Sequence, residues 1–222
     1  ELVKFGEVPE LNLGGGFGIN YTTADEAPDI ESIAFKIAEG VAAECAALGI
    51  AVPVLAFEPG RIIVGPTGVT LYTVGTIKDV ALTEEGAGAV RKYVSIDGGM
   101  SDNARPSLYD AAYTVRLASR ASSAQPALVR VVGKHCESGD IVVRDDYLPA
   151  DISNNDIVAV AATGAYCSSL SSNYNMLTRP PVVAISQGQA RLIVRGETEA
   201  DLFARDLRYQ ELLNSLSLNG KD

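Results

Sequence analysis

The sequence lacks tryptophan, has a single histidine, His135, and contains only three cysteines in 222 residues. Cys45, Cys136 and Cys167 form an odd set at irregular spacing, which predicts no disulfide framework and favours a reducing, cytoplasmic compartment. Because the chain has no CxxC pair and no second histidine, a zinc site is not expected, and we predict no other metal site.

Basic residues are also few: 18 Lys and Arg stand against 28 Asp and Glu, for a formal net charge of -10. Without a run of Lys and Arg, general binding to nucleic acid or to an anionic membrane surface is not expected, although one small anion could be held locally. No apolar run reaches the roughly 18 residues of a membrane helix, and no signal peptide opens the chain. The chain begins at Glu1 rather than Met, so we expect a piece of a longer protein or a trimmed one.

The first 67 residues predict one strand–helix–strand unit. Apolar segments at 8–13 and 52–61 are typical of short buried strands. Between them, residues 30–49 have apolar side chains at helical spacing and a helix stop at Gly49. This pattern is typical of an α/β fold with parallel strands.

From about residue 68 the pattern changes to short strands separated by Gly, Asp, Asn and Pro, which is typical of a β-sandwich or β-barrel. Residues 198–213 return to a helical pattern, with Thr198 and Asp201 spaced as a capping box. We therefore expect an α/β plus all-β chain. Its predicted parts are an α/β remnant at 1–67, a β-rich domain at 68–197, and a C-terminal helix and tail at 198–222.

Two turns in the α/β part point to anion binding. In LNLGGGFG, three consecutive glycines follow a strand, so bare backbone N–H groups could approach a phosphate closely. In EPGR, Glu58 and Arg61 lie at the end of the next strand, and the carboxyl ends of parallel strands form the crevice where α/β proteins place ligands. The alternatives are a tight chain reversal for the first turn and a solvated Glu–Arg pair for the second.

The stretch GKHCESGD, residues 133–140, sets His135 beside Cys136. It lies between two strand-like segments, and successive side chains on a strand point to opposite faces. The two side chains should therefore face away from each other, which disfavours a Cys/His catalytic dyad. Cys45, on the apolar side of the predicted helix, is interpreted as a core residue.

Five motifs occur in one order along the chain. They are LNLGGGFG, EPGR, the segment 94–109 that contains DGGMSDN and RPSLY, HCESGD, and the segment 162–175 that contains GAYC and SSNYN. Over nearly all of its length the chain resembles the C-terminal half of the diaminopimelate decarboxylases, pyridoxal-phosphate enzymes of the alanine racemase and ornithine decarboxylase fold group. HCESGD with DGGMSDN favours these enzymes over the arginine, ornithine and racemase relatives.

The resemblance implies an N-terminal (β/α)8 barrel that binds pyridoxal 5′-phosphate and a C-terminal β domain. This chain would hold the last units of an incomplete barrel, followed by a β-barrel or sandwich domain. The implied reaction is the decarboxylation of meso-2,6-diaminopimelate to L-lysine and CO2, the last step of lysine biosynthesis.

The resemblance also implies roles in cofactor binding. Glu58 would face the pyridine nitrogen of the cofactor, and Tyr166 would contact both cofactor and substrate. Arg61 would hold the phosphate and lie near the substrate. The backbone groups that would complete the phosphate site belong to Gly14, Gly15, Gly16 and Gly60.

Further matched positions concern the substrate. Arg105 and Tyr109 match residues that bind its distal end, where a planar guanidinium suits a carboxylate. Cys136 matches the proton donor that acts after decarboxylation, a role open to a thiol that is protonated at neutral pH. Glu137 would hold the distal ammonium group of the substrate. In the family this cysteine and glutamate serve the partner's site, so we expect a homodimer with shared active sites; His135 is assigned no catalytic role.

Such enzymes attach the cofactor through a lysine near the N-terminus, in a context like YAxKA. None of the lysines of this chain matches it: Lys4, Lys36, Lys78, Lys92, Lys134 and Lys221. Because the attaching amine is missing, we expect the chain to be inactive alone. Two alternatives stay open: a related decarboxylase that acts on another amino acid or a carboxylated polyamine, and a non-catalytic β-rich binding module.

Overall fold

The structure, a computed structural model, describes residues 6, 8–82 and 88–219. Its first part is a strand–helix–strand unit of β1 (Glu10–Asn12), α1 (Ile30–Leu48) and β2 (Val54–Ala56). The two strands pair in parallel, with Leu11 opposite Leu55. The sequence-based expectation of a βαβ unit is thus confirmed, with strands shorter than the apolar segments suggested.

Local capping sets both ends of α1. The Asp29 carboxylate accepts a hydrogen bond from the Ser32 backbone N–H, which satisfies a donor that the first helical turn leaves free. Gly49 ends the helix in the left-handed conformation, with φ of 64°, a conformation that glycine adopts at little cost. The predicted stop at Gly49 is therefore confirmed.

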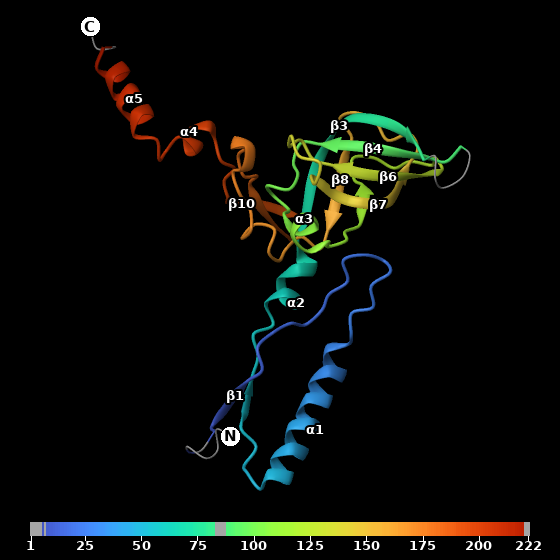
Figure 1. Ribbon diagram of the computed structural model, residues 1–222, viewed down its shortest axis with the longest axis vertical. Coiled ribbons are helices and arrows are strands. Elements are labelled where there is room, and N and C mark those ends of the chain that lie inside the picture. The colour runs from blue at the N-terminus through green and yellow to red at the C-terminus, as the bar shows by residue number, and fades with distance from the viewer. Residues whose placement is uncertain (1–5, 7, 83–87, 220–222) are drawn as a thin grey trace.

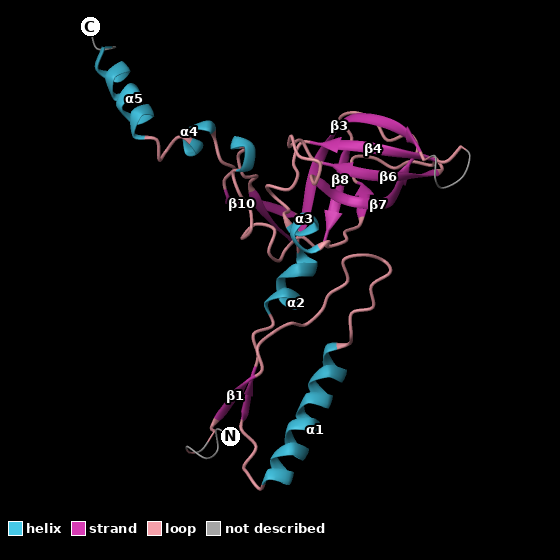
Figure 2. Ribbon diagram, in the orientation of Figure 1, coloured by secondary structure: helices cyan, strands magenta, loops and turns pink. Residues whose placement is uncertain are grey.

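A six-stranded sheet forms the body of the second part (Figures 1 and 2). Its strand order is β5-β8-β3-β4-β6-β7, with all neighbours antiparallel except β4 and β6. The strands are β3 (Val69–Ala81), β4 (Val90–Ile96), β5 (Val115–Leu117), β6 (Pro126–Val132), β7 (Ile141–Pro149) and β8 (Ile157–Ala161). The two outer strands meet where the Val115 backbone N–H donates to Asp146 at 2.8 Å. The sheet is thus a nearly closed barrel, as the strand pattern predicted.

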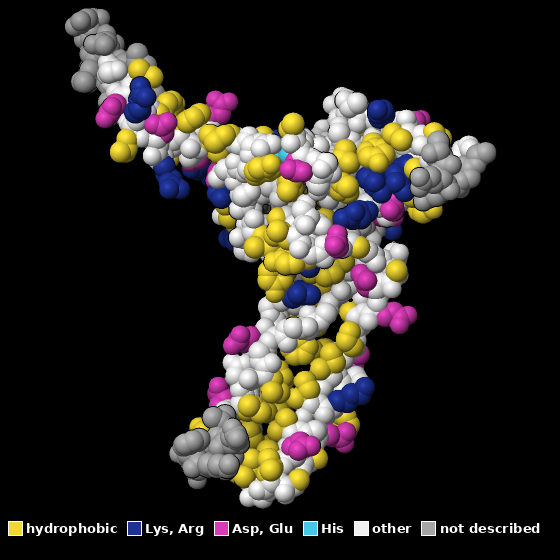
Figure 3. Space-filling view, in the orientation of Figure 1, with side chains coloured by type: hydrophobic (Ala, Val, Ile, Leu, Met, Phe, Trp, Pro, Cys, Tyr) yellow, Lys and Arg dark blue, Asp and Glu magenta, His cyan; other side chains and the backbone are white. Residues whose placement is uncertain are grey.

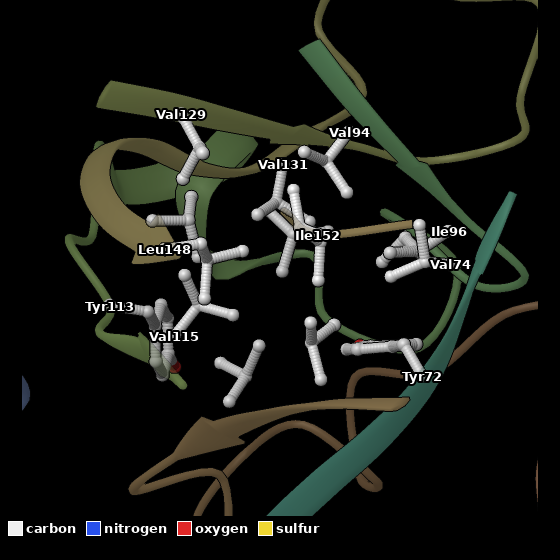
Figure 4. Packing of buried hydrophobic residues seen from close by; sticks show 14 residues of the cluster. Tyr72, Val74, Val94, Ile96, Tyr113, Val115, Val129, Val131, Leu148 and Ile152 are labelled. Carbon is white, nitrogen blue, oxygen red and sulfur yellow. The ribbon is translucent and has the colours of Figure 1, made fainter. Parts of the chain in front are cut away.

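The hydrophobic core lies inside this barrel (Figure 4). It consists mainly of valines that alternate along the strands, because every second side chain of a strand points inward. The valines with no exposed surface are Val94, Val115, Val129, Val131, Val158 and Val160. The barrel can therefore hold its shape through its own packing.

The α/β unit has far less core. Among the described residues of α1, only Cys45 is buried, which confirms its interpretation as a core residue. Phe35 and Leu48 are 63% and 69% exposed, and Val54 of β2 is 68% exposed. Figure 3 shows hydrophobic side chains along this projecting unit. Within the described part of the chain, nothing covers these apolar faces.

Short elements join and extend the two parts. Helix α2 (Gly60–Val64) and the 3-10 turn η2 (Gly65–Thr67) lead from β2 into β3, and helix α3 (Arg105–Tyr109) lies near them at the base of the barrel (Figure 1). After a second 3-10 turn, η3 (Tyr174–Met176), the strands β9 (Val182–Ser186) and β10 (Gln189–Val194) form a separate antiparallel hairpin.

The predicted single helix at 198–213 is wrong. The structure has α4 (Glu199–Leu202) and α5 (Leu207–Asn219) instead. The capping box at Thr198 and Asp201 is confirmed, but a second cap, Asp206, accepts from the backbone N–H groups of Arg208 and Tyr209 at 3.0 and 3.2 Å. A side chain that caps a new helix start competes with continuation of the preceding helix, so the chain bends there. No helix in the described ranges is both long enough and apolar enough to cross a membrane.

Arg120 lies in the turn between β5 and β6. It binds two carboxylates in the turn between β7 and β8. Its Nε and Nη2 each donate to the Asp156 carboxylate at 2.8 Å, and its Nη1 donates to Asp151 at 3.0 Å. The Asp156 side chain is only 7% exposed. Hydrogen bonds from Arg120 are the largest cause that lowers the pKa of Asp156 and of Asp151 below the ordinary value.

Acid should therefore weaken the barrel through this cluster. A carboxyl with a depressed folded-state pKa stabilises the fold fully above its unfolded pKa of about 4, and the contribution disappears as pH falls toward the folded value. We expect the melting temperature to decrease progressively below about pH 4. Arg120→Ala should lower it at pH 7 and flatten the decrease, as measured by circular dichroism. Arg144→Ala, which breaks an exposed pair with Asp110, is the control; equal acid slopes in the parent chain and Arg120→Ala would contradict the assignment.

Candidate functional site

The glycine turn after β1 packs directly against the EPGR turn after β2. The Glu58 backbone N–H donates to the Gly14 carbonyl at 2.8 Å. A Cβ atom on Gly15 would collide with the Glu58 carbonyl oxygen, so the two turns can approach only because this residue is glycine. Gly14 and Gly16 adopt positive φ angles of 72° and 84°, which favour glycine. The structure therefore makes one bare-backbone surface from the two predicted turns.

Asn12, the last residue of β1, links the same two turns through its side chain. Its Oδ1 accepts from the Gly14 backbone N–H at 2.7 Å, and its Nδ2 donates to Glu58 Oε1 at 2.9 Å. Both contacts hold the Glu58 carboxylate at the end of the parallel strands. Gly60 is the first residue of α2, and its backbone N–H donates to the Glu58 carbonyl at 2.9 Å.

The α/β unit meets the barrel at a glycine contact. The Gly164 backbone N–H donates to the Gly65 carbonyl at 3.2 Å, and the Thr163 N–H donates to the Gly68 carbonyl at 3.0 Å. A Cβ on Gly164 would collide with the Val64 carbonyl oxygen, and one on Gly68 would collide with Gly164. This close approach places the segment after β8 against α2.

Tyr166 lies in that segment, between two arginines. Its ring centroid is 5.5 Å from the Arg61 guanidinium carbon and 5.8 Å from that of Arg105, within the range of cation–π attraction. Tyr166 lies in the loop beyond β8, which ends at Ala161, and has a φ of 69°. The turn at Ala162, with φ of 58°, redirects the chain toward the arginines.

Arg105, at the first turn of α3, is buried at 8% exposure rather than solvated. Its Nη1 donates to the Tyr113 hydroxyl at 2.6 Å, and its guanidinium carbon lies 4.5 Å from the ring centroid of Tyr21. The rings of Tyr21 and Tyr113 meet edge to face at 5.3 Å. Aromatic faces and one phenol thus hold the guanidinium in place.

Neutral groups surround this buried cation. Burial raises the pKa of the Tyr113 phenol, and the neighbouring Cys167 thiol adds to the effect while Arg105 opposes it. Burial also raises the pKa of Cys167, so both groups stay protonated near neutral pH. Among the described residues, neither Arg61 nor Arg105 makes an ion pair, and the buried Nε of Arg61 has no hydrogen-bond partner. Unpaired cations in a chain of net charge -10 favour an anionic ligand.

The remaining candidates are exposed, unlike Arg105. Tyr109, at the end of α3, is 64% exposed, and Cys136 and Glu137 are exposed in the 133–140 turn between β6 and β7. His135 and Cys136 do face different environments, buried and exposed, although the segment is a turn and not a strand. Within the described ranges, no hydrogen bond or ion pair joins Cys136 or Glu137 to the two arginines. No group of three or more metal-ligating side chains gathers in those ranges.

Sequence reasoning missed several residues of the site. Asn12 follows a strand like any polar residue, and Tyr21 and Tyr113 belong to no motif, so nothing in the sequence marks their contacts with Glu58 and Arg105. Asp140 is the last residue of HCESGD, but the motif alone indicates no role for it. The available signal was position: Asn12 lies two residues before Gly14, where an Asn side chain can accept from an exposed backbone N–H.

This arrangement of a βαβ unit, a glycine-rich turn and a nearly closed sheet agrees with a class of cofactor-dependent decarboxylases. Residues 35–164 match the family described as pyridoxal-dependent decarboxylase, C-terminal sheet domain, and residues 3–65 match its pyridoxal binding domain. The first match covers more than half of the chain. The protein therefore belongs to the pyridoxal-dependent decarboxylase family, as its ordered motifs suggested.

Comparison with individual proteins shows which members of the family this chain is similar to. A diaminopimelate decarboxylase of Mycobacterium leprae is 57% identical over 92% of this chain and 43% of its own length. A solved diaminopimelate decarboxylase from M. jannaschii, also determined in complex with L-lysine, superposes with a TM-score of 0.80 at 33% identity over 92% of this chain and 44% of the other. A lysine/ornithine decarboxylase from Vibrio vulnificus, 24% identical with a TM-score of 0.62, shares the fold. The chain thus spans less than half the length of these relatives.

Differences in burial predict different reactivity of the three thiols. Cys45 and Cys167 are 6% and 5% exposed, whereas Cys136 is exposed. We expect Ellman's reagent to modify one cysteine rapidly in the native chain and all three after denaturation. Cys136→Ser should remove the fast phase, and Cys167→Ser should keep it. A fast phase that survives in Cys136→Ser would contradict the exposed position of this thiol.

Proposed function

We propose that this chain is the C-terminal part of a diaminopimelate decarboxylase, which converts meso-2,6-diaminopimelate to L-lysine and CO2 with pyridoxal 5′-phosphate. The observation that carries the proposal is the position of Tyr166 between Arg61 and Arg105, two cations without carboxylate partners among the described residues. The 57% identity to a diaminopimelate decarboxylase supports this substrate over those of other family members.

The two turns fit the phosphate of the cofactor. The backbone N–H groups of Gly15 and Gly16 and the Arg61 side chain would offer hydrogen-bond donors to an anion, while Gly14 and Gly60 shape the two turns with N–H groups that bond to Asn12 and Glu58. Glu58, oriented by Asn12, would face the pyridine nitrogen and keep it protonated. When bound, pyridoxal phosphate supplies an electron-poor ring that accepts the electrons released as CO2 departs.

For the substrate, Arg105 would bind the distal carboxylate and Tyr109 would contact the same end. Tyr166, between both arginines, would contact cofactor and substrate together. Burial of Arg105 among tyrosines strengthens its hydrogen bonds to a carboxylate, because water does not compete there. This feature favours a substrate with a distal carboxylate over a diamine precursor such as ornithine.

Cys136 and Glu137 would act in the site of a second subunit. Their exposure, and the absence of a hydrogen bond or ion pair between them and the arginines among the described residues, support a homodimer in which Cys136 donates the proton that replaces CO2 and Glu137 holds the distal ammonium group. The lysine that attaches the cofactor would lie outside this chain, so the chain alone would be inactive. The enzyme would work in the cytoplasm.

The exposed apolar faces of the α/β unit also fit a non-catalytic binding module. The unpaired arginines favour the enzyme, because a module that binds through apolar surface has no use for a buried cation such as Arg105, which has no carboxylate partner in the described ranges.

The first test of the cofactor site is Gly15→Ala in the full-length protein. The added Cβ collides with the Glu58 carbonyl, and overpacking of this kind costs about 1–3 kcal/mol, or about tenfold in affinity for each 1.4 kcal/mol. We expect weaker binding of pyridoxal phosphate to the resolved apoenzyme in equilibrium dialysis. Gly18→Ala is the matched control, because its Cβ would meet only the Pro28 side chain at 4.0 Å. Equal affinities in the two variants would contradict the proposed phosphate site.

The second test concerns the substrate. Full-length protein with pyridoxal phosphate should release lysine and CO2 from meso-diaminopimelate and act poorly on lysine or ornithine. Arg105→Lys should raise KM for diaminopimelate about 10- to 100-fold, because a lysine loses the paired hydrogen bonds to a carboxylate. Arg144→Lys, at an exposed ion pair, should leave KM unchanged. Equal turnover of ornithine, or an unchanged KM in Arg105→Lys, would overturn the assignment; lysine release by the present chain alone would show that the attaching amine lies within it.

A further inference from the structure

The 133–140 turn, which carries the proposed catalytic Cys136, is built around a buried His–Asp hydrogen bond that the reaction does not use. His135 Nδ1 and Asp140 Oδ2 lie 2.7 Å apart, and the two side chains are 0% and 2% exposed. Both oxygens of Asp140 also accept from backbone N–H groups, so Nδ1 is assigned as the donor in this contact. The pair therefore closes the base of the turn directly under Cys136 and Glu137.

Asp140 gathers the two neighbouring segments. Its Oδ2 also accepts from the His135 backbone N–H at 2.8 Å, and its Oδ1 accepts from the Met100 N–H at 2.7 Å. A Cβ on Gly133 or Gly99 would collide with the Asp140 carboxylate. DGGMSDN and HCESGD thus meet at one carboxylate, packed so closely that both neighbours must be glycine.

His135 is held from its ring face as well. The ring of Tyr174, from SSNYN, stacks on it at 5.6 Å between centroids with an interplanar angle of 11°. The Ser172 backbone N–H donates to the Ser101 carbonyl at 2.8 Å, which ties the same segment to DGGMSDN. Three motifs from distant parts of the chain therefore converge on one imidazole.

The turn is also tied to the helix that carries Arg105. The Ser107 hydroxyl of α3 donates to the Gly139 carbonyl at 2.9 Å. At the tip, the Glu137 N–H donates to the His135 carbonyl at 2.8 Å, and the Asp140 N–H donates to the Glu137 carbonyl at 3.1 Å. A shift of His135 would therefore move the backbone of Glu137 and Cys136.

We propose that His135 is a positioning residue for the decarboxylation: its Nδ1–H bond to Asp140 fixes the turn so that Cys136 and Glu137 project as one unit into the adjoining site. This inference rests on the proposed function. Misplacement of a reacting group by about 1 Å can cost about 100-fold in rate, so a rigid base for the turn has catalytic value. A histidine that served the core alone would affect stability and not the position of Cys136.

Two substitutions in the full-length holoenzyme separate these roles. His135→Phe keeps a flat ring against Tyr174 but removes the donor to Asp140. His135→Asn keeps an N–H donor near the place of Nδ1 but removes the stacking ring. We expect His135→Phe to lower kcat for diaminopimelate about tenfold or more and to raise KM about threefold, whereas His135→Asn retains kcat within about threefold of wild type.

Hydrogen exchange gives a readout that does not depend on activity. The backbone amides of Met100 and of residue 135 donate to Asp140. Hydrogen exchange at these two amides should become faster in His135→Phe and should remain slow in His135→Asn. Asp156→Asn is the control for a purely structural loss: it breaks a buried carboxylate contact at Arg120 and should lower the melting temperature without changing kcat or exchange in the turn.

The outcomes are distinct. Wild-type protein without activity on diaminopimelate refutes the proposed function. An active wild type whose kcat survives in His135→Phe, or falls equally in His135→Phe and His135→Asn, overturns the positioning role while leaving the function intact. Loss of kcat in Asp156→Asn as large as in His135→Phe would also overturn it, because general destabilisation would then explain both.

Discussion

The contact between Gly164 and the chain at Val64–Gly68 is the constraint on which the site depends. No side chain fits there, so the backbone that follows β8 lies directly against the backbone that leaves α2. This contact brings Tyr166, from the barrel, over Arg61, from the α/β unit. A larger residue at 164 would separate the halves, and with them the glycine turns after β1 and β2 from helix α3.

Within the described ranges, the arginines of the site differ from most other arginines of the chain in lacking carboxylate partners. The chain carries a net charge of -10, and seven of its arginines form ion pairs with carboxylates among the described residues, as Arg120 does with Asp156. Arg105 instead lies among tyrosines and a thiol that stay neutral, so its charge remains available to a ligand. Glu58, held by Asn12, is the acid at the turn. Neutral surroundings for the cations and a separate, oriented acid suit a ligand with an anionic group and a basic ring.

The two halves of the molecule differ in how they are stabilised. The barrel encloses its valines and closes through Asp146, whereas α1 buries only one of its described residues. A βαβ unit has to share its sheet with further strands to bury both faces. The match of residues 3–65 to a pyridoxal binding domain agrees with a unit that is part of a larger domain. The 133–140 turn, in contrast, is held by contacts within the second part, to Met100, Ser107 and Tyr174.

The sequence by itself determined the parallel βαβ unit, the helix stop at Gly49, the barrel strands and the family, because hydrophobic period, glycine position and motif order are local properties. It misjudged the C-terminal helix, where the Asp206 cap competed with helix continuation. Only the tertiary structure decided that Asn12 joins the two turns, that Tyr113 holds Arg105, and that Tyr174 stacks on His135. Each of these contacts links residues of different motifs or elements, so the folding of the whole chain sets their distances.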